Sequence, residues 1–432
     1  MFTQVYTSVH MGGTAPSQGT TDAHPAHVGP PRWDPADPAF RADPYPYYAR
    51  LRAEAPVYRP PTRSDLVITR YDDVARVLRS PDVSRDLDAN ARFDADNPVA
   101  VARRERRVGA KTILDLDPPD HTRLRRLVSK AFTPSAVERL RAWMTARVDA
   151  VLDRAAAAGG MELIDELAFP FPFDVISELL GMPTDRAPEV RDWSMALTAG
   201  LEPQATLADL DARDEALTHM IPYLLEIIEA RRADPRDDVL SALIAVEDDG
   251  DTLSAAELLS FVILLYVAGH ETTVNLIGNG ALALLRHPDQ LAAWRDDPAL
   301  DAVAVDELLR YDGPVQHTAR VAMQPMTFVG AGGEEIVAEP GQLLLTALGS
   351  ANHDPAVFDD PDTLRLGRPN ANRHLGFSAG IHYCLGAPLA KLEATIALSH
   401  LIRRFPGMRM VGEPHWRDRI TIRGVDRLTL EF

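Results

Sequence analysis

A long proline-free helical pattern, from Ser254 to Arg286, constrains the fold of this chain more than any other stretch. Ser254 and Glu257 have the spacing of a helix-capping box, and His287-Pro288 ends the pattern. At a rise of about 1.5 Å per residue, a helix over this stretch would be roughly 45 to 50 Å long, several times the usual length. Such a helix crosses the whole molecule, so we expect the other elements to pack around it.

The middle of this helix changes character abruptly. Residues 261–268 read FVILLYVA, and residues 269–273 then read GHETT, where a buried core would favour leucine. Breaks of this kind tend to mark functional or strained positions. We expect the hydroxyl of Thr272 to bond back to the carbonyl of Ala268 and to bend or open the helix there. The alternative is a helix whose polar face simply emerges into solvent.

The chain is expected to be mainly α with smaller β-sheets, an α+β class. Helical patterns dominate from Pro46 to about Tyr311, apart from a short strand predicted at LVITRY, residues 66–71. Strands and turns are expected at 313–348, a helix after Cys384, and a hairpin in the tail ITIRGVDRLTLEF. Prolines in PPRWDPADPAF predict a flexible N-terminal arm over residues 1–40, followed by a single domain over 41–432.

Composition limits the possible functions. A chain of 432 residues is long for one hydrophobic core, which leaves room for a bound prosthetic group. The net charge of -18 argues against nucleic acid or an anionic membrane as a general partner. The single cysteine, Cys384, excludes an internal disulfide and fits a reducing cytoplasm. The sequence shows neither a signal peptide nor about eighteen uninterrupted apolar residues, so we expect a soluble, cytoplasmic protein.

A helix opened by Pro118-Pro119 is predicted to present two different faces. His121 and Arg125 fall on one side beside apolar residues, where they would suit a buried anion such as a carboxylate. Arg123, Arg126 and Lys130 form a stripe roughly opposite, which would suit an acidic partner or merely water. The same His-to-Arg spacing occurs elsewhere in the chain, and a solvated face is the simpler interpretation of this pair alone.

The segment FSAGIHYCLG, residues 377–386, surrounds Cys384 with glycines just before a predicted helix, whose N-terminus would stabilise a thiolate. A buried structural cysteine would not require these glycines. A cysteine hydrolase would need a base, for which His382 is near in sequence, but no known nucleophile signature surrounds the thiol. A zinc site lacks enough soft ligands. Ligation of heme iron by a single thiolate remains.

Three motifs together resemble those of the cytochrome P-450 superfamily. FSAGIHYCLG fits its heme-binding loop, with Phe, two residues, Gly, one residue, a basic residue, one residue, Cys, one residue and Gly. AGHETT (268–273) is similar to the oxygen-activating motif of its long central helix, and ELLR (307–310) to its Glu-x-x-Arg pair. The order and separations also agree, and the resemblance covers residue 40 to the C-terminus. The chain looks like a soluble bacterial-type member.

The resemblance implies a P-450 fold with the long helix over a buried heme b (iron protoporphyrin IX). It makes Cys384 the axial ligand of the iron, and Glu271 and Thr272 the catalytic acid–alcohol pair that delivers protons. The other positions matched to heme contacts are His121, Arg125, Arg320 and His382 at the propionates, Phe377 beside the thiolate, and the small residues Ala268 and Gly269.

The resemblance also implies a structural role for Glu307 and Arg310. Their spacing alone is not diagnostic, because Glu138/Arg141 and Glu229/Arg232 share it. Relatives complete the pair with an arginine from a Pro-x-Arg-Phe-like segment, which this chain replaces by DPDTLRLGR. Arg368 is the expected third partner, and Arg365 is the alternative.

The implied activity is a heme-thiolate monooxygenase that inserts one oxygen atom from O2, by hydroxylation or epoxidation, into a lipophilic small molecule of secondary metabolism. The chain has no flavin or dinucleotide domain, so electrons must come from an external ferredoxin and ferredoxin reductase. The stripe Arg123, Arg126 and Lys130 is the expected docking site. A peroxide-driven oxidase and a heme-binding recruitment module without turnover are the alternatives, and the Glu271-Thr272 pair speaks against the second.

Overall fold

The computed structural model describes residues 30–35, 37–61, 65–91, 98–106, 111–183, 185–200, 202, 205–248, 250–419 and 421–432. Residues Pro31–Phe432 form one compact unit. Trp33 and Phe40, inside the arm predicted from the prolines, are buried, and the indole N–H of Trp33 donates to Nε2 of His317 at 3.1 Å. Trp33 and Phe40 therefore belong to the packed unit, which moves its boundary to the N-terminal side of residue 40. Residues 1–29 of the predicted arm lie outside the described residues.

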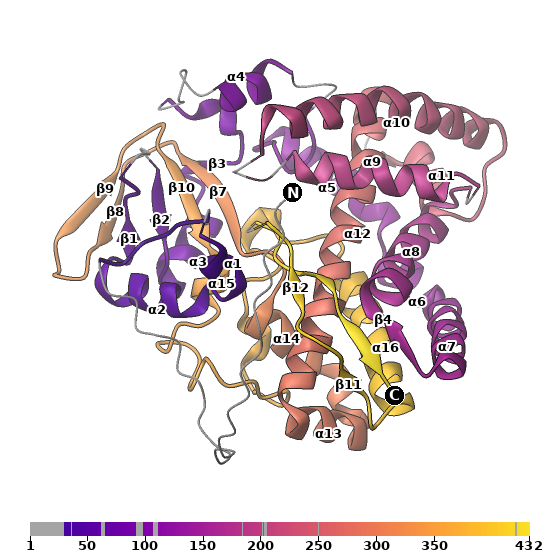
Figure 1. Ribbon diagram of the computed structural model, residues 1–432. Coiled ribbons are helices and arrows are strands. Elements are labelled where there is room, and N and C mark those ends of the chain that lie inside the picture. Colours follow the sequence, from indigo (N-terminus) through magenta and orange to yellow (C-terminus); the bar gives the residue numbers. More distant parts are fainter. Residues whose placement is uncertain are drawn as a thin grey trace, which may run out of the picture. The chain divides into compact units, whose positions relative to one another are not determined.

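Helices make up most of this unit (Figure 1). Within the described residues the α-helices are α1 (Pro38–Ala42), α2 (Tyr45–Glu54), α3 (Tyr71–Arg79), α4 (Pro98–Glu105), α5 (Asp120–Ala131), α6 (Pro134–Arg139), α7 (Arg141–Ala158), α8 (Pro170–Leu180), α9 (Ala187–Ala199), α10 (Leu207–Ala233), α11 (Val239–Ala245), α12 (Ala255–Arg286), α13 (Pro288–Asp296), α14 (Ala304–Asp312), α15 (Leu348–Ala351) and α16 (Ala387–Arg404). The short 3-10 turn η5 (Gly380–His382) precedes Cys384.

The strands form small sheets. They are β1 (Val57–Tyr58), β2 (Leu66–Ile68), β3 (Val83–Ser84), β4 (Gly160–Glu162), β5 (Glu247–Asp248), β6 (Asp251–Thr252), β7 (His317–Ala322), β8 (Met326–Val329), β9 (Glu335–Ala338), β10 (Leu343–Ala347), β11 (Arg409–Met410), β12 (His415–Trp416), β13 (Val425–Arg427) and β14 (Thr429–Glu431). The largest sheet has the order β1-β2-β10-β7-β3, with β2 and β10 parallel and its other pairs antiparallel. The predicted mainly α fold with smaller sheets is confirmed.

Helix α12 is the centre of the packing, as the sequence predicts. Its N-cap is Ser254, and both hydrogen bonds of the capping box with Glu257 are present. It packs against α8, α14 and α16 (Figure 1). Its C-terminal half is almost entirely buried. Among the described helices, α12 is also the one long and apolar enough to cross a membrane, but 67% of its most apolar window is buried by the rest of the chain. Its hydropathy is therefore that of a core helix.

Two local predictions need correction. The strand predicted over 66–71 ends at Ile68, and Tyr71 begins α3, where its backbone N–H donates to the carboxylate of Asp354 at 2.8 Å. The tail forms two strands that pair with different partners instead of with each other: β13 with β12, and β14 with β4 and β11. An isolated hairpin is only marginally stable, whereas β14 in its three-stranded sheet buries Leu430.

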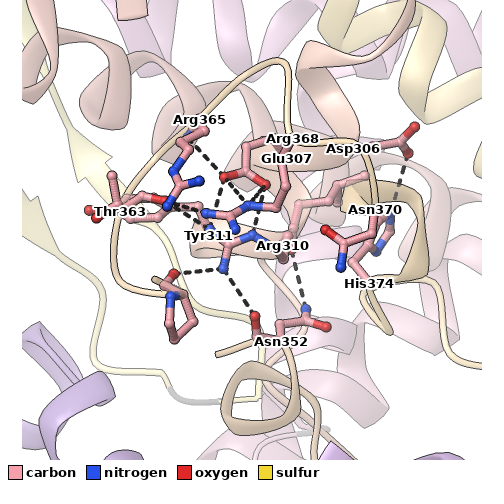
Figure 2. Close-up of polar contacts among 12 residues, drawn as sticks. Asp306, Glu307, Arg310, Tyr311, Asn352, Thr363, Arg365, Arg368, Asn370 and His374 are labelled. Carbon is pink, nitrogen blue, oxygen red and sulfur yellow. Dashed lines mark hydrogen bonds and ion pairs between the residues drawn. The ribbon is translucent and has the colours of Figure 1, made fainter. Parts of the chain in front are cut away.

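Glu307 lies between two buried arginines, as Figure 2 shows. Its carboxylate accepts from Arg310 at 2.7 and 2.9 Å and from Nε of Arg368 at 3.0 Å to both oxygens. Arg365 donates only its backbone N–H to Glu307, at 2.9 Å, and its side chain pairs with Asp360 instead. Arg368 is therefore the third partner, which confirms the first of the two sequence-based assignments.

Candidate active site

Cys384 lies in a tight loop between η5 and α16. Its backbone N–H donates to the carbonyl of Phe377 at 3.0 Å, and the N–H groups of Gly386 and Ala387, at the start of α16, point at its sulfur. Burial raises the pKa of the Cys384 thiol, while those two N–H groups and Arg125 act against the rise. The sulfur thus faces donors that stabilise a thiolate, as expected for a cysteine at a helix N-terminus.

Gly380 fixes this loop against α3. Its φ is +72°, and a Cβ built on it would lie 2.5 Å from the carbonyl oxygen of Leu78. No other residue type fits both the backbone conformation and this approach. The glycine in the motif is therefore explained by packing of the loop onto α3.

Four basic side chains from three distant parts of the chain lie close together beside Cys384. His121 and Arg125 come from α5, Arg320 from β7 and His382 from η5, and the rings of His121 and His382 are 4.3 Å apart. The structure thus brings together every residue that the sequence assigned to the propionates. Both ring nitrogens of His121 are buried and lack a hydrogen-bond partner within the described part of the chain.

The charges in this basic cluster oppose one another. Burial and then Arg320 lower the pKa of His382 to about 3, and burial followed by Arg85 lowers the pKa of Arg320 to about 9. Burial, with Arg125 adding to it, also lowers the pKa of His121. The ring nitrogens of His121 have no hydrogen-bond partner among the residues described, and the cations of this cluster lie close together. Both features favour binding of an anion, so the basic cluster fits a group that carries carboxylates.

Arg85 belongs to the basic cluster, although the sequence did not reveal it. In the pairing of β3 with β7, Ser84 lies opposite Val321, so the next residue, Arg85, lies opposite Arg320. The guanidinium of Arg85 donates to the carbonyl of Ala319 at 3.0 Å. Burial lowers the pKa of Arg85. Only the register of two strands far apart in sequence places this arginine here, and no local pattern signals it.

One strip of α12 stays open while its flanks are buried. Ala268 is exposed, and Gly269 and Thr272 are partly exposed, whereas Val267 and His270 are buried. The Thr272 hydroxyl donates to the carbonyl of Ala268 at 2.9 Å, which confirms the predicted back-bond. The expected opening of the helix is wrong, because α12 runs unbroken from Ala255 to Arg286. The bond is accommodated within the regular ladder, and the small residues leave space beside the helix.

Glu271, which precedes Thr272 on α12, is buried. Its Oε1 pairs with Arg417 and, at 3.4 Å, with Arg419, while its Oε2 is buried without a hydrogen-bond partner among the described residues. Neither arginine was found from the sequence, since both follow β12, far from α12 along the chain. Glu271 and Thr272 have no hydrogen bond or ion pair to the basic cluster in the described ranges.

The basic stripe predicted on α5 is partly neutralised within the chain. Arg123 pairs with Glu257 and, at 3.3 Å, with Asp251, and Lys130 donates to the backbone carbonyl of Glu247 at 3.0 Å. Arg123 therefore forms a structural ion pair with Glu257 that links α5 to the start of α12. The interpretation of this stripe as a free cationic docking surface is not supported for Arg123.

A surface groove of about 760 Å³ opens instead between α3 and the cysteine loop. Its lining includes three arginines and one acidic residue, Asp72. Residues that shape it include Tyr71, Arg76, Arg79, Arg373, Gly380 and Tyr383. Beside it Ile381 and Tyr383 are exposed, at 52% and 47% of their surface.

The fold and this site define a protein with a thiolate loop, an anion-binding basic cluster and a central helix with an open strip. A family profile described as cytochrome P450 matches residues 296–409. The chain is 43% identical over 404 residues to cytochrome P450 107B1 of Saccharopolyspora erythraea, covering 91% of this chain and 96% of that protein. It is 40% identical to cytochrome P450 monooxygenase PikC of Streptomyces venezuelae, covering 91% and 92%.

Solved structures agree. The Bacillus subtilis 168 bacillaene polyketide synthase cytochrome P450 PksS superposes with a TM-score of 0.82 at 35% identity, covering 93% of this chain and 99% of that one. The chain therefore belongs to the cytochrome P450 family, and it is a P450 monooxygenase of the bacterial type. This membership confirms the resemblance that the motifs indicate. It also implies a heme cofactor.

Proposed function

We propose that this protein uses heme b to insert one oxygen atom from O2 into a lipophilic small molecule of secondary metabolism. The observation that carries the proposal is Cys384 in its donor-rich loop next to the basic cluster, because a thiolate suits the iron of heme and a basic cluster suits its propionates. In this assignment Cys384 would ligate the iron, and His121, Arg125, Arg320 and His382 would hold the propionates. Heme with a thiolate ligand supplies O–O bond cleavage.

The other site residues leave space beside α12, hold the cysteine loop and supply groups for proton delivery. Ala268 and Gly269 leave room beside α12, and the backbone carbonyl of Phe377 fixes the cysteine loop through the N–H of Cys384 at 3.0 Å. Thr272 carries a hydroxyl on the open strip, and Glu271 holds a carboxylate next to it in sequence. We assign these two residues to proton delivery, which requires positioned groups more than a strong acid.

The substrate class rests on the relatives. PksS belongs, by its description, to a polyketide synthase system. We infer that this enzyme modifies a lipophilic intermediate of a comparable biosynthetic route, and that it works in the cytoplasm as a single domain that includes residues 31–432. A ferredoxin with its reductase is the proposed electron source.

Spectroscopy on the purified protein tests this proposal. The reduced carbon monoxide complex should show the red-shifted band of thiolate-ligated heme, and lipophilic ligands should shift the heme absorption. With a surrogate ferredoxin and reductase, binders should yield products that carry one added oxygen atom from labelled O2. Absence of the red-shifted band would remove the heme-thiolate assignment. Faster product formation with peroxide alone would favour a peroxide-driven oxidase. If neither route gives a product, a recruitment module would be favoured.

We propose that the ferredoxin docks over the groove between α3 and the cysteine loop. Exposed Ile381 and Tyr383 provide an apolar centre, and Arg79 and Arg373 provide positive charge at its edge. Gly380 lies against the backbone of Arg79, so this surface is continuous with the loop that carries Cys384. A basic rim around an apolar patch suits a small acidic protein, since complementary charge steers association.

Charge reversal separates this surface from the stripe on α5. Arg79→Glu combined with Arg373→Glu should raise the KM for ferredoxin by roughly tenfold, because two favourable charges become repulsive. Arg123→Gln should change that KM by less than about twofold, since Arg123 is engaged in intramolecular pairs. Stopped-flow reduction at several ionic strengths measures both, and ligand-induced spectral shifts should stay unchanged. The opposite ranking of the two variants would return the docking site to α5.

A further inference from the structure

We infer that Arg417 and Arg419, on the C-terminal turn after β12, are positioning residues that anchor Glu271 for proton delivery. The inference rests on the proposed monooxygenase function and adds to it the residues that control its acid. It gives the C-terminal turn a part in oxygen chemistry, although the turn lies far from α12 in sequence.

The geometry at Glu271 distinguishes its two carboxylate oxygens. Oε1 accepts from both Arg417 and Arg419, so its position is fixed by two guanidinium groups. Oε2 is buried and has no hydrogen-bond partner within the described residues. A buried acceptor without a partner is costly and signals an unfilled role. We assign to Oε2 the atom that binds and releases the proton, while Oε1 serves as the anchor.

The two arginines are also more exposed to solvent than the carboxylate that they bind. The carboxylate is 1% exposed, whereas the side chains of Arg417 and Arg419 are 13% and 20% exposed. In the proposed relay, an oxygen acceptor takes the proton from Oε2, and a hydronium ion from solvent then returns one to Oε2. Each transfer breaks one O–H bond and forms one, and no electrons move. His270, the neighbouring imidazole, does not supply that proton at neutral pH, because burial lowers the pKa of His270 to about 4.

The C-terminal turn is itself held in place from two sides. The buried carboxylate of Glu202, between α9 and α10, accepts the backbone N–H groups of Thr421 and Ile422 at 3.1 and 3.3 Å. The backbone N–H of Arg417 donates to the carbonyl of Gly424 at 3.0 Å. These contacts hold the backbone of the turn near both guanidinium groups, so the anchor of Glu271 depends also on Glu202.

The ring of Trp416 strengthens the base of the turn. The guanidinium of Arg423 lies 3.6 Å from its centroid and bonds Asp312 at 3.0 Å. Arg423 therefore ties the turn to the end of α14, while Arg417 remains directed at Glu271. Substitution of Arg417 should leave these supporting contacts intact, which makes it suitable for a test.

Arg417→Met is the decisive variant. The share of electrons recovered as product should fall roughly five- to tenfold, with the balance lost as hydrogen peroxide, because an unanchored acid delivers protons poorly. The solvent isotope effect on product formation should rise, while the substrate KM stays within about twofold. Arg419→Met should show a smaller loss, since its contact is longer, and Arg417→Lys should restore part of the coupling.

A matched control and a second measurement keep the test sharp. Arg427→Met, at an exposed site on β13, should leave the electron balance unchanged. In urea unfolding, Arg417→Met should lower the midpoint in the wild-type background but much less in a Glu271→Gln background, which reports the ion pair independently of turnover. Unchanged coupling and isotope effect in Arg417→Met would overturn the inference. If the wild-type protein shows no red-shifted carbon monoxide band, the proposed function itself would be overturned.

Discussion

Cys384→Ser is expected to abolish the thiolate-type carbon monoxide band and to reduce product formation below detection. The serine hydroxyl is nearly isosteric and can still face the N–H groups of Gly386 and Ala387, so the loop should keep its shape. A hydroxyl, however, stays protonated where a thiol ionises, and it cannot push comparable electron density onto a metal. The loss should therefore be chemical and not structural.

Absorption spectra and circular dichroism check this expectation together. The serine variant should retain its far-ultraviolet spectrum and a melting temperature within a few degrees of the unsubstituted protein with heme removed. His382→Gln is the companion variant, because it alters the basic cluster and leaves the sulfur in place. That variant should keep the red-shifted band but lose heme more readily on dilution. Turnover that survives Cys384→Ser would contradict the assignment of Cys384 as iron ligand.

Glu307→Gln is expected to destabilise the fold more than any other single substitution considered for this chain. Glu307, Arg310 and Arg368 are all buried, and the side chains of Glu307 and Arg310 are 0% exposed. Removing one partner from a buried ion pair costs about 3–5 kcal/mol, because the remaining charge is left uncompensated. Here two guanidinium groups lose their carboxylate together. Against a typical stability of about 5–15 kcal/mol, much of the protein should fail to fold.

Arg365 provides the matched control for the network at Glu307. Its side chain pairs with Asp360 at the surface, and only its backbone N–H reaches Glu307. Arg365→Gln should therefore cost less than about 1 kcal/mol, as is usual for an exposed pair. Arg368→Gln should cost several times more. Chemical denaturation and the yield of heme-loaded protein measure all three variants, and equal losses at 365 and 368 would contradict the geometry of Figure 2.

Identical spacing carried different meanings in this chain, which limits what sequence can settle. Glu138–Arg141 pairs at 2.5 Å with both side chains more than half exposed, and Glu229–Arg232 pairs at 2.6 Å, also at the surface. Only Glu307–Arg310 is buried. The motifs around it identified the pair through family resemblance, whereas the helical periodicity alone could not. The sequence likewise favours Arg368 over Arg365 as the third partner, and the hydrogen bonds of Glu307 confirm Arg368.

By itself, the sequence determined the features that depend on neighbouring residues. Capping at Ser254 and Glu257 and the back-bond of Thr272 are formed within a few residues, so local chemistry suffices to predict them. Tertiary structure alone decided that Arg85 joins the basic cluster and that Arg417 anchors Glu271. These contacts depend on strand register and on a turn more than a hundred residues away, and no local preference encodes such distances.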